Sequence, residues 1–108
     1  MEKKLALVVD DEKNIRLTFS ETLTQMGFDT RTAANGEEAL LKMKKTDFDL
    51  VLLDFRMSGM DGIEVLRCIR EGYPKVRVIM ITAHGTIESA VEAMKLGAVD
   101  FIKKPCTP

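Results

Sequence analysis

The chain of 108 residues is long enough for one hydrophobic core and too short for two, which excludes a second catalytic or DNA-binding domain within these residues. Sixteen basic residues against 17 acidic residues leave a net charge of −1, so no basic excess favours a nucleic acid or an anionic membrane surface. The longest apolar runs are far shorter than a membrane span. We therefore expect a soluble domain that contacts neither nucleic acid nor membrane.

The first residues lack the pattern of a secretory signal, because the apolar stretch Leu5–Val9 is short and no small-residue cleavage site follows it. This favours a cytoplasmic protein. The two cysteines, Cys68 and Cys106, have no Cys-x-x-Cys spacing and only one histidine to support them, which argues against a zinc site or a disulfide framework. Cys68 is interpreted as a small apolar residue on a helix.

Continuous apolar runs alternate along the chain with apolar residues at helical spacing. The run Leu5–Val9 is continuous, as in a strand covered on both faces, and it ends at Asp10 and Asp11. A helix is expected from about Glu12, and Gly27 can end it in the left-handed conformation. The apolar stripe of this helix consists of Ile15, Phe19, Leu23 and Met26.

The next two units repeat this alternation. Phe28–Ala33 is short and polar, as expected for a strand at or near a sheet edge, and Asn35 can cap the helix after it. Leu50–Leu53 predict a second apolar strand, which ends at Asp54, and residues 58–62 have the composition of a loop. The apolar faces of the two helices in these units consist of Ala39, Leu40, Met43, Ile63, Leu66 and Ile69.

The last part of the chain predicts two more strands with a helix between them. Val76–Ile81 form the first of these strands, which stops at Thr82, and Val99–Ile102 form the second. The helix is expected to end at Gly97. We expect most of its apolar stripe to be core and only the edge of the stripe to be open to a partner. That stripe consists of Ile87, Ala90, Val91 and Met94.

Strands that are joined through helices return in the same direction, which requires a parallel sheet with right-handed crossovers. The sequence therefore predicts an α/β fold with a doubly wound, five-stranded parallel sheet. Such a sheet needs helices on both faces, yet the sequence stops three residues after Pro105 without a fifth helix. We expect one face to be short of cover, and we interpret residues 1–108 as one domain truncated before its fifth helix. The alternatives are that these residues are the ordered part of a longer chain, or that another chain supplies the missing packing.

Chemically active side chains follow the predicted strands at the carboxyl edge of the sheet, where open parallel sheets bind ligands. They are Asp10, Asp11, Asp54, Thr82 and Lys104. Three converging carboxylates repel one another unless a cation lies between them, and oxygen ligands favour Mg²⁺ or Mn²⁺. The hydroxyl and the ammonium group supply donors for phosphoryl oxygens. Each residue alone is more typical of a turn or a cap, but their joint occurrence predicts a site for a phosphoryl group beside a divalent ion.

The same residues resemble a known family, the receiver (phosphoacceptor) domains of bacterial two-component response regulators. The resemblance covers nearly the whole chain and is carried by Val8-Val9-Asp10-Asp11-Glu12, Ala34-Asn35-Gly36-Glu37-Glu38-Ala39-Leu40, Asp49-Leu50-Val51-Leu52-Leu53-Asp54, Met60-Asp61-Gly62, Ile81-Thr82-Ala83, Gly97-Ala98 and Lys104-Pro105. It implies a flavodoxin-like receiver fold with strand order 2-1-3-4-5.

The resemblance also implies a role for each residue of the phosphoryl site. Asp54 would accept a phosphoryl group from a histidine kinase, and Lys104 would contact that group. Asp11 and Asp54 would bind Mg²⁺ (or Mn²⁺) together with the main-chain carbonyl of Arg56, while Asp10 would act mainly through water.

Further residues would transmit or tune the phosphorylated state. Thr82 would move toward the phosphoryl group, and the ring of Phe101 would turn inward in response, although Phe101 is equally well explained as a core residue of the last strand. Arg56 and His84 flank the route of the attacking water and would tune the phosphoryl lifetime. The alternative for Arg56 is that its side chain extends into solvent. For His84, a loop residue near the phosphate is favoured over the alternative of a phosphodonor.

The function implied by the resemblance is a cytoplasmic signalling switch that turns over no external substrate. Phosphorylation would change the surface of the fourth helix and fifth strand and thereby control an output domain or a downstream protein. Residues 83–98 resemble receivers attached to enhancer-binding transcription activators, so the output is expected to be transcriptional. A homodimer is an open possibility, and no direct nucleic-acid binding by this domain is expected.

Two other functions are compatible with the same residues. The chain would be a small metal-dependent phosphatase if Asp54 served as the nucleophile for an external substrate, but Arg56 stands where such an enzyme normally carries a second acid. The chain would be a binding-only, receiver-like domain if it had kept the fold alone, but the joint presence of Asp11, Thr82 and Lys104 speaks against this.

Overall fold

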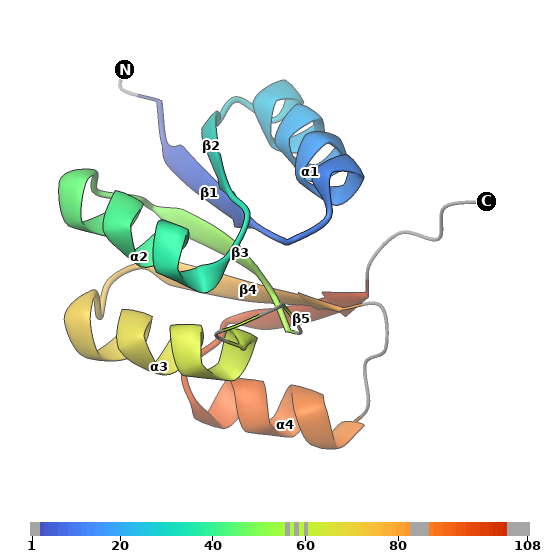
Figure 1. Cartoon of the computed structure of the whole chain (residues 1–108), viewed down its shortest axis with the longest axis vertical. Helices are drawn as coiled ribbons and strands as arrows, with labels where there is room; N and C mark the ends of the chain where they lie inside the picture. Colours follow the sequence, from blue (N-terminus) through green and yellow to red (C-terminus); the bar gives the residue numbers. More distant parts are fainter. Residues whose placement is uncertain (1–2, 56, 58, 60, 83–86, 104–108) are drawn as a thin grey trace.

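The computed structural model of the protein describes residues 3–55, 57, 59, 61–82 and 87–103, and for residues 87–90, 101 and 103 it describes the backbone. Strands and helices alternate along the chain (Figure 1). The strands are β1 (Leu5–Val9), β2 (Asp29–Ala33), β3 (Leu50–Asp54), β4 (Arg77–Thr82) and β5 (Asp100–Lys103). The helices are α1 (Lys13–Gln25), α2 (Gly36–Lys45), α3 (Gly62–Gly72) and α4 (Ile87–Lys95).

The five strands form one parallel sheet in the order β2-β1-β3-β4-β5. This confirms the predicted α/β class, the parallel sheet and the order implied by the resemblance. The polar strand β2 lies at one edge, as its composition predicts. The apolar strand β1 and strand β3, which is apolar up to its last residue Asp54, are neighbours in the interior. Because all strands run in the same direction, their carboxyl ends meet along one edge of the sheet.

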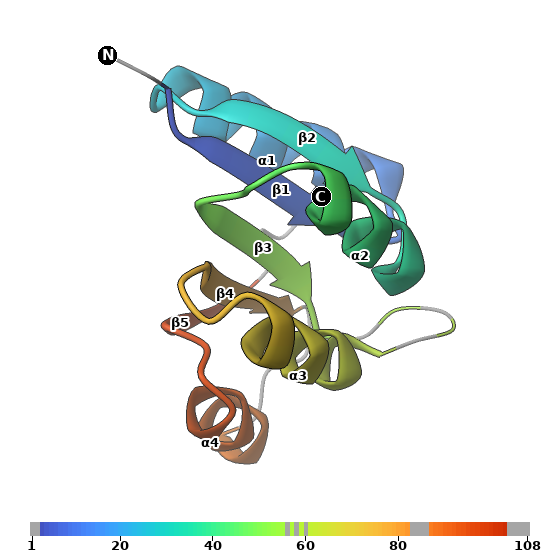
Figure 2. The same cartoon turned by 90° about the vertical axis from the view of Figure 1, so that its left-hand side faces the viewer.

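The main core lies between the sheet and the three helices α2, α3 and α4, which cover one face (Figure 2). Each strand alternates its side chains between the two faces, so Leu7 and Val9 of β1 point into this core together with Val51 and Leu53 of β3. The helices contribute buried residues at helical spacing. They are Ala39, Met43, Val65, Leu66, Ile69 and Ala93.

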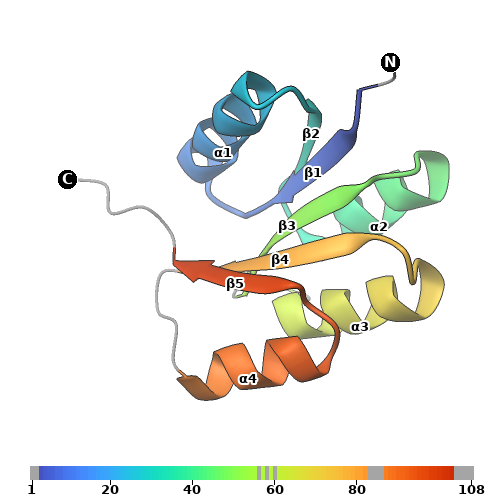
Figure 3. The ribbon, with the colours of Figure 1, turned by 180° about the vertical axis from the view of Figure 1, so that it is seen from behind.

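The opposite face carries a smaller core, which α1 covers (Figure 3). Leu23 of α1 packs there against Ala6 and Val8 of β1 and against Leu52 of β3. Leu50 and Ile79 lie on the same face and are only partly buried. Among the described residues α1 is the one helix on this face, which agrees with the expected shortage of cover.

The start of α2 follows the prediction closely. The side chain of Asn35 accepts a hydrogen bond of 2.8 Å from the main-chain N–H of Glu38, and the Glu38 carboxylate accepts one of 3.2 Å from the N–H of Ala34. This reciprocal pair satisfies two donors at the start of the helix that would otherwise lack partners. The cap fixes where the chain leaves β2 and turns toward α2.

One expectation about side-chain burial is wrong. Val91 and Met94 of α4 are 47% and 48% exposed, whereas Ala93 between them is fully buried, so a smaller part of the predicted stripe is core. The reason is that α4 packs on the sheet through the small Ala93 side chain, which leaves the larger neighbours outside. Cys68 lies on α3 as predicted, and its side chain is exposed.

Candidate functional site at the carboxyl edge of the sheet

Three consecutive acidic residues follow β1 and form a cluster. Asp10 is fully buried, whereas Asp11 and Glu12 are exposed. One carboxylate oxygen from each residue lies within 4.8 Å of the corresponding oxygens of the other two. Carboxylate oxygens are hard ligands that suit Mg²⁺ or Mn²⁺, and a divalent ion would offset the repulsion among such closely spaced charges. The donor set therefore fits the predicted ion in both element type and charge.

Among the described residues, Asp10 makes hydrogen bonds to three others. Its N–H donates to the carbonyl of Ala33 at 3.1 Å, which ties the end of β1 to the end of β2. Its carboxylate accepts a hydrogen bond of 2.9 Å from the N–H of Glu12. Its carbonyl accepts a hydrogen bond of 2.8 Å from the guanidinium of Arg16 on α1. Asp10 therefore shapes the turn that presents the exposed carboxylate of Asp11.

Asp54 ends β3 beside this cluster and is only 2% exposed. The pairing of Val9 with Leu53 makes Asp10 and Asp54 the next residues along two neighbouring strands. On the other side, Asp54 pairs with Ile81, so Thr82 lies one residue further along β4. Thr82 is 3% exposed. The structure thus brings Asp10, Asp11, Asp54 and Thr82 to one edge of the sheet.

The start of α3 packs directly against the backbone that follows β3. The N–H of Gly62 donates to the carbonyl of Phe55 at 3.1 Å. A Cβ atom at Gly62 would lie 2.2 Å from the main-chain oxygen of Asp54, which no side chain tolerates. The side chain of Asp61 caps the same helix by accepting from the N–H of Glu64 at 3.1 Å. This close approach explains the glycine in the Met60-Asp61-Gly62 motif.

The structure gives no side-chain position for four of the predicted site residues. Arg56, His84 and Lys104 lie outside the described residues. Phe101 is described by its backbone, which pairs with Met80 in the sheet.

Sequence reasoning missed three residues of this edge. Glu12 belongs to the Val8-Val9-Asp10-Asp11-Glu12 motif, but it is not among the acidic residues that the sequence predicts for the site. The contact of Arg16 with the Asp10 carbonyl spans six residues and has no periodic signal. Gly62 could have been found from its place after the helix cap Asp61, since a glycine there indicates a close backbone approach.

The pattern that defines the response regulator receiver domain family matches residues 6–108. The chain belongs to this family. This receiver domain is 41% identical over 105 residues to the response regulator protein PilR of Pseudomonas aeruginosa, a match that covers 97% of the chain and 24% of PilR. It is 40% identical over 102 residues to the alginate biosynthesis transcriptional regulatory protein AlgB of the same species, covering 94% of the chain and 23% of AlgB. The chain spans about a quarter of the length of these curated relatives.

Solved structures of similar proteins share the fold of this receiver domain. The chemotaxis protein CheY4 of Vibrio cholerae superposes with a TM-score of 0.91 at 34% identity, covering 99% of this chain and 91% of that one. The complex of CheX and CheY with BeF₃ and Mg²⁺ from Borrelia burgdorferi contains a chain with a TM-score of 0.91 at 38% identity, covering 96% and 80%. Receiver domains are signalling modules whose phosphorylation controls output domains.

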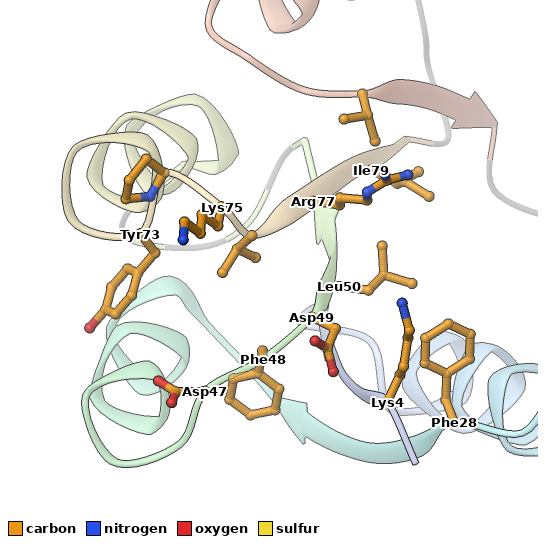
Figure 4. Close-up of a pocket in the computed structure, with 13 residues that line it drawn as sticks. Lys4, Phe28, Asp47, Phe48, Asp49, Leu50, Tyr73, Lys75, Arg77 and Ile79 are labelled. Atoms are coloured by element: carbon orange, nitrogen blue, oxygen red, sulfur yellow. The ribbon is translucent and has the colours of Figure 1, made fainter. Parts of the chain in front are cut away.

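The receiver domain also has an open groove of about 880 Å³ (Figure 4). Its walls include Lys4, Asp49 and Arg77, which lie at the amino ends of β1, β3 and β4. The apolar surface of the groove includes Leu50 and Ile79 from the less covered sheet face. The groove is therefore at the opposite end of the strands from Asp54 and plays no part in the acidic site.

Within the described part of the receiver domain, no helix has the length and hydrophobicity that a membrane span requires.

Proposed function

We propose that this domain is a phosphorylation switch whose phosphoacceptor is Asp54. The observation that carries the proposal is the burial of the Asp54 carboxylate, 2% exposed, at the carboxyl end of a central strand beside the acidic cluster. The pattern of the receiver family over residues 6–108 supports the same assignment. Solved relatives described as bearing a phosphorylated aspartic acid, or bound to BeF₃ and Mg²⁺, support the chemistry.

Phosphoryl transfer onto Asp54 makes one bond and breaks another. A carboxylate oxygen of Asp54 forms a bond to phosphorus while the bond from phosphorus to the donor's histidine nitrogen breaks, so the acid becomes an acyl phosphate. Water later attacks that phosphorus, the bond from phosphorus to the Asp54 oxygen breaks, and inorganic phosphate leaves as the carboxylate is restored. The chain therefore modifies itself, and we propose no external substrate.

The cation that suits this site is Mg²⁺, with Mn²⁺ as a substitute. Asp11 and Asp54 would hold it together with the main-chain carbonyl of Arg56, and Asp10 would act mainly through water. When bound, the ion supplies positive charge next to the phosphoryl oxygens. The exposed carboxylate of Asp11 and the turn shaped by Asp10 support this arrangement.

The remaining residues of the site have proposed roles in recognition and signalling. Lys104 would pair with a phosphoryl oxygen, and Thr82 would donate its hydroxyl to another. Phe101 would follow the movement of Thr82 and carry it to the surface of α4 and β5. Arg56 and His84 would tune the phosphoryl lifetime, which the half-life of the phosphorylated wild type and its Arg56→Ala and His84→Ala variants would test.

The partners follow from the same proposal. A sensor histidine kinase would supply the phosphoryl group, and an output domain in the same chain or a separate protein would read it. The likeness to PilR and AlgB favours a transcriptional output of the enhancer-binding type in the cytoplasm. We propose that residues 1–108 form the receiver part, and that a further helix covers the sheet face around Leu50 and Ile79.

The proposal is tested by incubating the protein with acetyl phosphate, with and without Mg²⁺, and measuring intact mass. We expect one added phosphoryl group in the presence of Mg²⁺ and none after Asp54→Asn, because an amide cannot act as the acceptor. Asp47→Asn, which removes an exposed carboxylate from the loop before β3, is the matched control and should be modified like the wild type. Equal modification of Asp54→Asn and the wild type would refute the assignment.

A further inference from the structure

Arg16 binds both ends of the acidic turn after β1. Its half-buried side chain donates from Nη1 to the carbonyl oxygen of Asp10 at 2.8 Å. Its main-chain N–H donates to the carbonyl oxygen of Glu12 at 3.1 Å, as part of the first turn of α1. The two carbonyls that flank Asp11 in the sequence are therefore both held by one residue of the helix.

Two main-chain N–H groups of the turn also make hydrogen bonds. The N–H of Asp10 donates to Ala33 in β2, and the N–H of Glu12 donates to the Asp10 carboxylate. The cap residue of α1, Glu12, makes no side-chain hydrogen bond to the start of the helix. Through this hydrogen bond, the side chain of Arg16 on α1 orients the peptide group that joins Asp10 to Asp11.

We propose that Arg16 is a positioning residue for the magnesium site, an inference that rests on the proposed function. A planar guanidinium with fixed donor geometry holds a carbonyl in one orientation better than a flexible ammonium does. Fixing the peptide between Asp10 and Asp11 keeps the Asp11 carboxylate next to those of Asp10 and Glu12 before the ion arrives. Residues that orient metal ligands in this way contribute strongly to affinity although they do not touch the ion.

If Arg16 positions the turn, removing its side chain should weaken Mg²⁺ binding. If Arg16 acts only through its positive charge, the same change should strengthen Mg²⁺ binding. The side chain carries a positive charge close to a cation site, so its charge alone repels Mg²⁺, and removing that charge alone would tighten binding. Removing the hydrogen bond to the Asp10 carbonyl frees the turn and weakens binding. The sign of the change in affinity therefore distinguishes the two roles.

The test is a calorimetric Mg²⁺ titration of the wild type, Arg16→Met, Arg16→Lys and Lys13→Met. We expect Arg16→Met to weaken Mg²⁺ binding about tenfold, the lower end of the range for groups that orient metal ligands. Arg16→Lys should have an intermediate affinity. Lys13→Met removes an exposed charge at the start of the same helix and is the charge control, with an affinity equal to or slightly tighter than that of the wild type.

Circular dichroism at the titration temperature shows whether each variant is folded, so a loss of affinity is not mistaken for a loss of structure. Unchanged or tighter binding by folded Arg16→Met would overturn the positioning role and leave the proposed function intact. Absence of Mg²⁺ binding by the wild type would overturn the magnesium site and, with it, this inference. An affinity of Arg16→Lys equal to that of the wild type, together with tighter binding by Arg16→Met, would assign the effect to charge alone.

Discussion

At Gly62, the start of α3 lies directly against the end of β3. A side chain at this position would meet the main-chain oxygens of Asp54 and Phe55, at 2.2 and 2.8 Å from its Cβ atom. These are backbone atoms of the strand end and of the residue after it, so they cannot move aside as a flexible side chain would. A change at Gly62 therefore acts on the position of Asp54 itself.

We expect Gly62→Ala to destabilise the protein by about 3 kcal/mol, the upper part of the range for overpacking at a close contact. Phosphorylation by acetyl phosphate should slow in parallel, because the strand end must shift. Gly72→Ala is the control, since Gly72 ends the same helix with open space around its Cβ position and the substitution there is expected to stabilise by up to about 1 kcal/mol. Urea unfolding measures both changes, and a Gly62→Ala protein as stable as the wild type would contradict the packing described.

At the scale of elements, α1 and α4 end in the same way. Gly27 and Gly97 have φ angles of 101° and 103°, a left-handed conformation that favours glycine. The residue after each glycine, Phe28 or Ala98, donates its N–H to a carbonyl five residues earlier, at 3.0 Å in both cases. The two ends differ in their surroundings. A Cβ atom added at Gly27 would have no neighbour within 4 Å, whereas one added at Gly97 would lie 2.6 Å from Cδ of Arg70.

Arg70 cannot easily give way at that contact. Its guanidinium donates to the carbonyl of Pro74 at 3.1 Å and also to the carbonyl of Val76, so the α3 side chain fastens the loop before β4. Desolvation of this partly buried group lowers the pKa of Arg70. The side chain thereby links the end of α3 to the end of α4, the helix that carries the proposed signalling surface.

We expect Gly27→Ala to cost about 1 kcal/mol from backbone strain, and Gly97→Ala to cost about 1 kcal/mol more because of the contact with Arg70. In a double-mutant cycle, Arg70→Ala should remove the additional cost of Gly97→Ala and leave the strain. Denaturant unfolding of the four variants checks this. Equal costs at Gly27 and Gly97 would show that Arg70 does not restrict the end of α4.

For the whole molecule, the parallel sheet places the acidic site and the apolar groove at opposite ends of the strands. Ligands at the acidic edge bind the folded chain, because residues 10, 54 and 82 come together only when β1, β3 and β4 are paired. Binding to the folded state alone raises stability by mass action. The magnesium site should therefore be visible in the unfolding of the whole domain.

We expect Mg²⁺ at 100 times its Kd to raise the free energy of unfolding by about 2.7 kcal/mol, and chelation by EDTA to reverse the gain. Asp11→Asn should reduce the gain, because it removes an exposed carboxylate from the cluster. Thermal unfolding with and without the ion measures the effect. An identical gain in the wild type and in Asp11→Asn would place the bound ion elsewhere.

The sequence predicts the sheet and most of its site because the information is local. Continuous apolar runs predicted β1 and β3, and an acid after each run predicted the residues of the carboxyl edge, whereas the strand order came from the family resemblance. The structure differs where tertiary packing decides. The exposure of Val91 and Met94 depends on how α4 meets the sheet, and the contact of Arg16 with Asp10 depends on the path of a turn. No periodicity encodes either feature.

Locating the phosphoryl group on the chain decides whether Asp54 carries it. Borohydride reduces an aspartyl phosphate to homoserine, which peptide mass spectrometry places at a single residue. After incubation with acetyl phosphate and Mg²⁺, we predict homoserine at position 54, with its yield lost when Mg²⁺ is chelated. Homoserine at position 10, 11 or 61, with Asp54 unmodified, would refute the assignment of Asp54 as the phosphoacceptor.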